Sequence, residues 1–208
     1  MQPMNGFLPA PHVLRRCLVL ASAALVLPLG GRLAAAQEKP AGGAPAAMAP
    51  PTPAPELESL KPLVGTWSCQ GAAPAGAMGP GSPEVKYQSS FKVTSLMGGF
   101  AYQLAYDQKK SKEHPMHFEG AWRTGFDGSK RKLAWSWFDN LGDVGVQYSP
   151  AFEGDTLVIE GEGAMMGRHA MLRDTFIRKG EKQLHWKGEV KPDGVQVWTV
   201  IGEDDCKK

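Results

Sequence analysis

The 208-residue sequence lacks an excess of charge of either sign, with 23 Lys and Arg against 21 Asp and Glu. A formal net charge of +2 gives no support to nucleic-acid binding, which needs a basic patch or stripe. The apolar run at residues 17–29 is shorter than the ~20 residues of a membrane-spanning helix. There are three cysteines and little helical periodicity. These absences, with a length typical of one domain, predict a single domain with tails.

Residues 1–36 have the pattern of a secretory signal peptide. Arg15 and Arg16 precede the apolar run, and small residues at 34–36 resemble a peptidase cleavage site. This segment holds three Arg and no acidic residue, so the remainder has 20 basic and 21 acidic residues. We therefore expect an exported protein, periplasmic or extracellular, with no membrane span after signal cleavage.

Residues 37–56 are rich in Pro and Ala and predict a flexible spacer, because this composition cannot bury a core. Six of the 17 prolines lie between residues 40 and 55, whereas 20 of the 25 glycines and all six tryptophans follow residue 56. The predicted folded domain is therefore residues 57–208.

Two cysteines, Cys69 and Cys206, remain once the signal peptide is removed. In an oxidising compartment such a pair favours a disulfide, which would join the two ends of the domain. Two free thiols or an intermolecular bond are the alternatives. Neither cysteine has a second Cys or a His nearby in the sequence, which argues against a zinc site.

Helical periodicity is limited to residues 55–60, and the rest of the domain alternates in the manner of strands. Pairs such as Asp127-Gly128 and Lys179-Gly180 separate many of the strands and are typical of tight hairpin turns. Short strands joined by short turns predict an antiparallel barrel or sandwich. Because each strand has one polar and one apolar face, we expect an all-β, antiparallel up-and-down β-barrel of about ten strands with a short N-terminal helix. The expected strands are residues 63–71, 84–95, 100–107, 116–126, 131–139, 144–152, 156–162, 168–178, 183–191 and 195–201.

The apolar face of the expected strands is unusually aromatic and carries several hydroxyl groups. A barrel of this size is either filled by side chains or holds one small ligand. The residues expected to line the interior and contact a ligand are Tyr87, Tyr102, Tyr106, Phe118, Trp122, Trp135 and Trp137.

Two stretches resemble known barrel families. Residues 56–67, which end in Leu-Val-Gly-Thr-Trp, look like the short helix and Gly-x-Trp opening strand of lipocalin-like barrels. Residues 137–142, Trp-Phe-Asp-Asn-Leu-Gly, follow a Phe-Asp turn at 126–127, and this combination resembles the exported bacterial family catalogued as domain of unknown function 1579. The resemblance covers most of residues 57–208 and implies a secreted lipocalin-like β-barrel with no assigned activity. Many lipocalins place an Arg in the last strand against the opening Trp, and residues 195–208 contain no Arg.

Three groups of residues suggest a metal or haem, and each has a simpler interpretation. His114 and His117 would supply only two ligands, fewer than a zinc or copper site needs, and we expect them on the surface. The second group is Met165, Met166, His169 and Met171. It suits Cu(I), but Met also fills gaps at the end of a barrel. Nitrobindin-like barrels hold haem through a His in the final strand, whereas residues 195–201 contain none and His185 is expected to face water. We therefore predict no metal site and no cofactor.

Two carboxylates, Asp139 and Asp174, are expected on the inward side, where they would suggest acid–base chemistry. A structural role is favoured: Asp139 bonds its own turn, and Asp174 pairs with Arg173 or Arg178. There is no nucleophile elbow, catalytic triad spacing or phosphate loop in the sequence. We therefore predict that the protein is not an enzyme.

The leading functional hypothesis is a barrel that binds a small apolar molecule in its interior, as a monomer or weak oligomer. One alternative is a filled-barrel structural or interaction protein of the cell envelope. The other is a haem- or copper-binding barrel.

Overall fold

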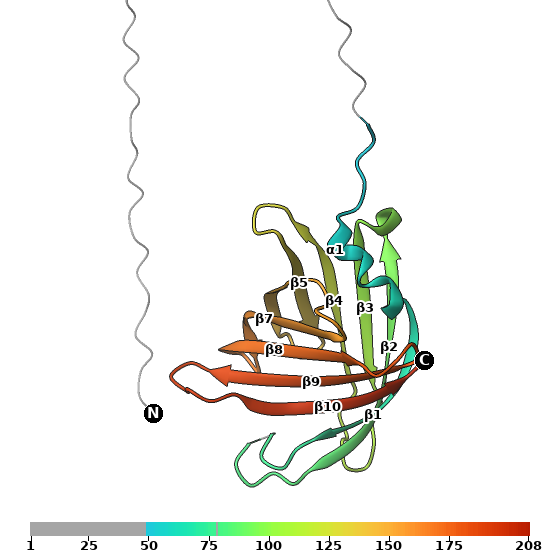
Figure 1. The fold of residues 1–208 in the computed structure, drawn as a ribbon. Coiled ribbons are helices and arrows are strands. Elements are labelled where there is room, and N and C mark those ends of the chain that lie inside the picture. Colours follow the sequence, from blue (N-terminus) through green and yellow to red (C-terminus); the bar gives the residue numbers. More distant parts are fainter. Residues whose placement is uncertain (1–48, 78) are drawn as a thin grey trace, which may run out of the picture. The chain divides into compact units, whose positions relative to one another are not determined.

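Ten antiparallel strands form a closed β-barrel in the computed structural model, which describes residues 49–77 and 79–208 (Figure 1). The predicted signal peptide and most of the predicted spacer lie outside the described residues. The predicted fold class is confirmed. The helical elements are α1 (Pro55–Glu58), η1 (Lys61–Leu63) and η2 (Met97–Gly99). The strands are β1 (Gly65–Ala73), β2 (Val85–Leu96), β3 (Ala101–Gln108), β4 (Phe118–Asp127), β5 (Lys132–Asp139), β6 (Val144–Ser149), β7 (Thr156–Met165), β8 (Arg168–Arg178), β9 (Gln183–Pro192) and β10 (Thr199–Lys207).

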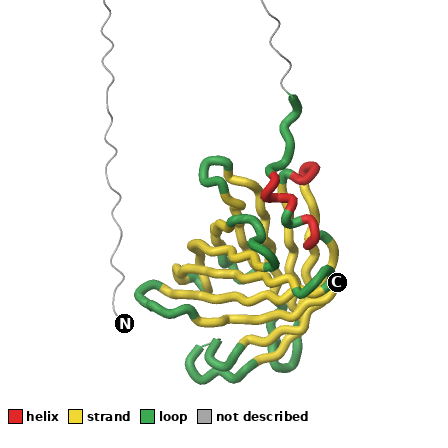
Figure 2. Tube along the Cα trace, in the orientation of Figure 1, coloured by secondary structure: helices red, strands yellow, loops and turns green. Residues whose placement is uncertain are grey.

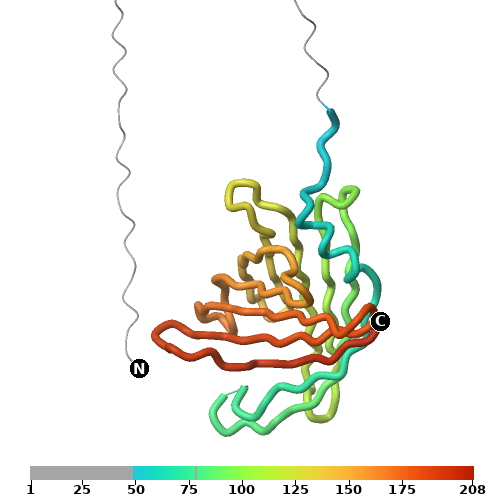
Figure 3. Tube along the Cα trace, viewed as in Figure 1, coloured from blue at the N-terminus to red at the C-terminus, as the bar shows by residue number. Residues whose placement is uncertain are grey.

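Each strand pairs with the next along the chain, and β1 pairs with β10 to close the barrel. Figure 3 shows this closure as the blue-green start of the domain beside its red end. The predicted disulfide is confirmed: Cys69 on β1 and Cys206 on β10 are direct cross-strand partners and are bonded to each other. The bond therefore fastens the two strands that no hairpin connects. A buried disulfide also suits an oxidising compartment.

All ten expected strands overlap those observed, but the expected last strand, residues 195–201, shares only residues 199–201 with the observed one. The observed strand β10 covers Thr199–Lys207. Its sequence contains Gly, Glu and two Asp, which are uncommon in strands. Pairing with neighbours on both edges stabilises the strand conformation here despite that composition.

The short helices close one end of the barrel, where Figure 2 draws them in red. Leu57, Leu60 and Leu63 are buried, and each contributes about 1.5–3 kcal/mol by removing its side chain from water. The indole Nε1 of Trp67 donates to the Leu63 carbonyl at 2.8 Å, which fixes the helical segment against β1. Prolines at the start of both helices suit a position where the missing N–H has no partner to lose.

A lysine side chain lies over the ring of Trp67, in the opening strand of the barrel. The Lys208 ammonium lies 5.2 Å from the centre of the Trp67 ring and donates to the Pro62 carbonyl at 3.0 Å. A cation therefore covers the opening Trp, although no residue from 195 to 208 is Arg.

The hydrophobic core fills the half of the barrel next to α1. Residues from all regions of the sheet meet there, among them Trp67, Tyr102, Leu133, Trp135 and Ile159. Because this half is packed, any space for a ligand must lie in the other half. In the described part of the chain no helix is long and apolar enough to cross a bilayer.

Candidate ligand-binding cavity

A cavity of ≈ 270 Å³ lies in the half of the barrel away from α1. Its rim is formed by side chains of the connecting loops, including the exposed Met116, Leu141 and Met166. Its floor, formed by Leu104 and Phe176, belongs to the packed core. A second space in the packed half measures only ≈ 10 Å³. The barrel is thus filled at one end and hollow at the other.

Aromatic rings form one wall of the cavity. Trp137 lies between Phe118 and Trp122, with ring centres 6.1 Å and 4.2 Å away. Of the seven residues expected to contact a ligand, five line this cavity: Tyr87, Tyr106, Phe118, Trp122 and Trp137. The other two, Tyr102 and Trp135, lie in the packed half.

Inward-facing glycines allow the large rings to lie flat against the wall. A Cβ atom on Gly120 would overlap the Trp137 ring, and one on Gly188 would lie 2.6 Å from the Trp186 ring. A Cβ atom on Gly202 would lie 3.2 Å from the same Trp186 ring. A side chain at any of these positions would push an indole toward the centre of the cavity. The glycines therefore help to keep the cavity open.

Asp174, on β8, is a buried carboxylate held by two donors. The Gln147 amide Nε2 donates to its Oδ2 at 2.9 Å, and the Trp186 Nε1 donates to its Oδ1 at 3.0 Å. Trp122 Nε1 donates to Gln147 Oε1 at 3.3 Å. An indole N–H can only donate, so the Gln147 amide must turn its oxygen toward Trp122 and its NH₂ group toward Asp174. Both Asp174 oxygens are consequently acceptors, an arrangement that fits the ionised carboxylate.

The expected pairing of Asp174 with Arg173 or Arg178 is wrong. Arg173 Nε donates to Glu189 at 2.9 Å, and Arg178 pairs with Asp155 at 3.5 Å. Successive residues of a strand point to opposite faces, so the neighbouring Arg173 cannot reach an inward carboxylate. Burial raises the pKa of Asp174 to about 6, against the opposing effect of its two hydrogen bonds.

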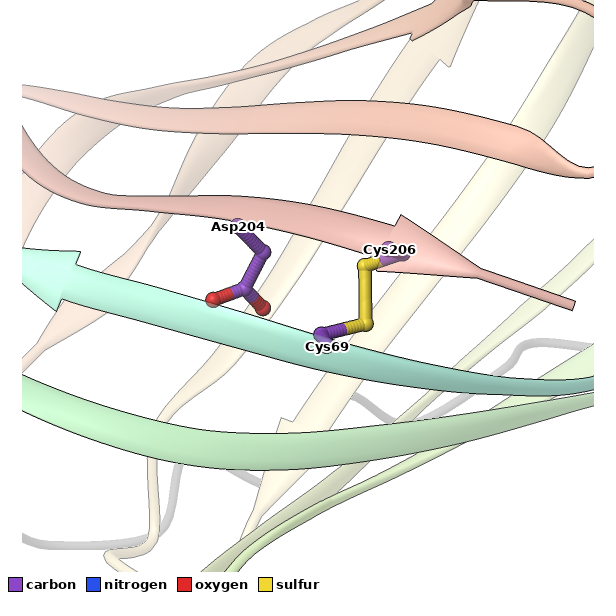
Figure 4. Close-up of side chains that lie close together, drawn as sticks. All are labelled: Cys69, Asp204 and Cys206. Carbon is purple, nitrogen blue, oxygen red and sulfur yellow. A yellow bond between two sulfur atoms is a disulfide. The ribbon is translucent and has the colours of Figure 1, made fainter.

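Asp204, on β10, is a second buried carboxylate in the cavity wall. Its Oδ2 accepts from Ser89 Oγ at 3.0 Å and from the Tyr106 hydroxyl at 3.4 Å. Its Oδ1 is buried without a hydrogen-bond partner, and the carboxylate lies next to the disulfide (Figure 4). Burial raises the pKa of Asp204. Burial and this carboxylate also raise the pKa values of Tyr87 and Tyr106, so both phenols remain protonated donors.

Two further aspartates organise the rim. Asp139 bonds its own turn as expected: its Oδ1 accepts from two backbone N–H groups at 2.9 Å and 3.1 Å, and its Oδ2 accepts from Trp137 Nε1 at 3.0 Å. The Asp143 carboxylate accepts from the backbone N–H groups of Met166 and Gly167, at 2.8 Å and 3.2 Å. Asp143 thus ties the β5–β6 loop to the β7–β8 turn.

The two histidines at residues 114–117 do not converge, and only one is on the outer surface as expected. His114 lines the cavity, and its ring centre lies 6.4 Å from that of Tyr87. His117 Nε2 lies 2.8 Å from Asp107 Oδ2. His117, Asp107 and Glu119 each place one ligand atom within 4.8 Å of the others, in a group that is partly exposed.

The residues considered for copper are separated by the strand geometry. Met165 lines the cavity, whereas His169 is exposed and lies 2.8 Å from Asp193 on the outside. Met171 alternates with the inward Leu172. His185, considered for haem, also faces outward and lies 3.1 Å from Asp205.

With this geometry established, comparison with known families gives one match. Residues 52–203 match the family described as "Protein of unknown function (DUF1579)". The chain belongs to this family. The resemblance noted from the sequence is therefore confirmed over residues 52–203, which include β1 to β9 and the first part of β10. No curated protein matches the chain.

In this member of the family, the cavity residues that sequence reasoning missed are polar: Gln147, Asp143 and Asp204. Strand alternation places Trp186 on the apolar face of residues 183–191, although it was not among the expected ligand contacts. Asp204 was missed because the last strand was placed too early. Gln147 was missed because on β6 the apolar residues face outward and the polar ones inward: Val144 and Val146 are more than half exposed, whereas Gln147 is 0% exposed.

Proposed function

We propose that this protein binds a small, largely apolar molecule in the open half of its barrel. The observation that carries the proposal is the ≈ 270 Å³ cavity with a rim of exposed side chains and a wall of aromatic rings. This volume is close to the lower end of the ~300–1,000 Å³ range of small-molecule sites, so a ligand with one or two rings fits best.

Burial of the ligand supplies the driving force. A ligand of this size buries about 150–250 Å² of apolar surface, similar to an aromatic side chain. At about 25 cal/mol per Å² the gross gain is about 4–6 kcal/mol, from which the cost of immobilising the ligand is subtracted. We therefore expect dissociation constants in the millimolar range for simple probes, and no tighter than tens of micromolar.

The proposal includes export and binding without chemical conversion. The signal-like residues 1–36 and the disulfide both support an oxidising compartment outside the cytoplasm. The hydrogen-bond donors to the two buried carboxylates are Trp186, Gln147, Ser89 and Tyr106. None of these donors is a histidine, the residue that most often transfers protons in catalysis, and this supports binding without conversion.

Titration calorimetry with phenylpropanol, a neutral apolar probe, tests the proposal. Wild-type protein should bind the probe saturably. Leu172→Trp places an indole in the cavity and should abolish binding, whereas Met171→Trp, the matched change on the outer face of the same strand, should not. Absence of binding to wild-type protein, or equal binding by the Leu172→Trp variant, would contradict the proposal. Circular dichroism confirms that both variants fold.

A further inference from the structure

The charges of the cavity point to the chemical class of the ligand. We propose that it carries a protonated amine, whose ammonium group binds Asp174 while its apolar part packs among the aromatic rings. This inference rests on the proposed function and narrows it from small apolar molecules to apolar amines.

The first observation is an imbalance of charge. Among the described residues that line the cavity there are four aspartates and neither a Lys nor an Arg. The titratable lining residues are Tyr87, Tyr106, His114, Asp139, Asp143, Asp174 and Asp204. Buried charges in proteins are normally paired with an opposite charge. The described lining residues provide no Lys or Arg to balance the aspartates, and a cationic ligand supplies that positive charge.

The second observation is that the Asp174 carboxylate has hydrogen-bond acceptor positions available to a ligand. The carboxylates of Asp139 and Asp143 accept backbone N–H groups of the rim. Asp204 Oδ1 also has no hydrogen-bond partner, but this residue is only 2% exposed and lies beside the disulfide, so a ligand reaches it less readily. Asp174 is 8% exposed, and each of its oxygens receives one hydrogen bond. A carboxylate has about four acceptor positions, so two remain for an ammonium group.

The third observation is the placement of the rings. Trp186 donates to Asp174 directly, and Trp122 is joined to it through Gln147. Both indoles therefore direct an N–H group toward the Asp174–Gln147 pair, which leaves their ring surfaces to contact the apolar part of a ligand. The Trp122 and Trp137 rings, with centres 4.2 Å apart, provide the apolar surface for the rest of the ligand.

A matched series of probes tests the inference: phenylpropylamine, phenylpropanol and phenylpropionate, each titrated calorimetrically at about pH 8. A charge-assisted hydrogen bond predicts that the amine binds about tenfold tighter than the alcohol or better. The anion should bind most weakly because all the acidic groups of the cavity oppose it. In Asp174→Asn the preference for the amine should disappear while affinity for the alcohol is retained.

The control variant is Asp205→Asn. This variant also removes one negative charge, but from the outer face of the barrel, where Asp205 is paired with Lys179 and His185. This variant should keep the full preference for the amine. It separates a local effect of Asp174 from a change in the net charge of the protein.

Wild-type protein provides a second test that does not depend on a variant. The pKa of Asp174 is about 6 in the empty barrel because the carboxylate is buried. Between about pH 8 and about pH 5 the amine should therefore lose about tenfold in affinity, and the alcohol should lose none. The groups that face Asp174 directly, Gln147 and Trp186, do not titrate. Asp174→Asn keeps His114 and the other three aspartates of the cavity, so its affinity for the amine should not change over the same pH range if the loss in wild type comes from Asp174.

The outcomes are distinguishable. If the alcohol binds but the amine binds no tighter, or if the preference survives at about pH 5 and in Asp174→Asn, the inference is overturned and the proposed function stands. If no probe binds wild-type protein, the proposed function itself fails.

Discussion

Replacing Asp174 with Asn should change how the stability of the barrel depends on pH. The ordinary pKa of this carboxyl is 3.8, and burial raises it to about 6 in the folded protein. The folded state therefore binds the proton more tightly than the unfolded state, and stability falls as the pH rises through this window. With 1.36 kcal/mol for each pKa unit, the full loss is about 3 kcal/mol, most of it between about pH 4 and about pH 7.

The assay is urea unfolding, followed by tryptophan fluorescence, for wild type and Asp174→Asn over this pH range. The stability of wild type relative to the variant should decrease by about 3 kcal/mol as the pH rises. Taking the difference removes contributions shared by both proteins, including that of Asp204. The Asn side chain also places its NH₂ group against one of the two donors, Gln147 or Trp186. That adds a cost that does not vary with pH.

Asp205→Asn is again the control, with the opposite expected sign. Hydrogen bonds from Lys179 and His185 lower the pKa of Asp205, so its ionised form stabilises the fold and this variant should lose a little stability at neutral pH. A difference for Asp174→Asn that is independent of pH would contradict this prediction, because it would mean that burial does not raise the pKa of Asp174. A difference that grows with pH would show that the carboxylate is paired with a cation.

Two other changes test how the barrel is held together and how it is shaped. The disulfide closes a loop of 137 residues, so the double variant Cys69→Ala with Cys206→Ala should lower the free energy of unfolding by about 5 kcal/mol by the chain-entropy relation. Urea unfolding measures this loss, with chemically reduced wild type as the comparison. A loss below about 1 kcal/mol would contradict the prediction. Gly120→Ala places a methyl group against the Trp137 ring and should cost about 1–3 kcal/mol and shift the tryptophan emission. Gly128→Ala, with open space around it, should leave both unchanged.

Strand alternation was sufficient to predict most of the barrel. On β2, β3 and β4 the apolar residues point inward, and the tyrosines and tryptophans expected inside are inside. On β6 the same rule fails, because Val144 and Val146 face outward while Gln147 and Ser149 are buried. The polar side chains are tolerated there because each is bonded to an indole, Gln147 to Trp122 and Ser149 to Trp135.

The last strand was misplaced for a related reason. Residues 202–207 contain mostly charged and small side chains, which are poor strand formers by themselves. They form a strand because β1 and β9 are present on either side to accept and donate its backbone hydrogen bonds. Asp204 was consequently not recognised as an interior residue.

The amino-acid sequence was enough to predict the fold class and the aromatic character of the interior, and it favoured a disulfide over two free thiols, because strand alternation, turn chemistry and cysteine count are local or compositional properties. The division of the barrel into a packed end and a hollow end could not be predicted in this way. That division depends on where α1 and Leu60 enter the barrel and on which glycines face large rings. The tertiary structure also placed Asp174 and Asp204 in one cavity without a basic partner, a relation between distant strands that local pattern does not contain.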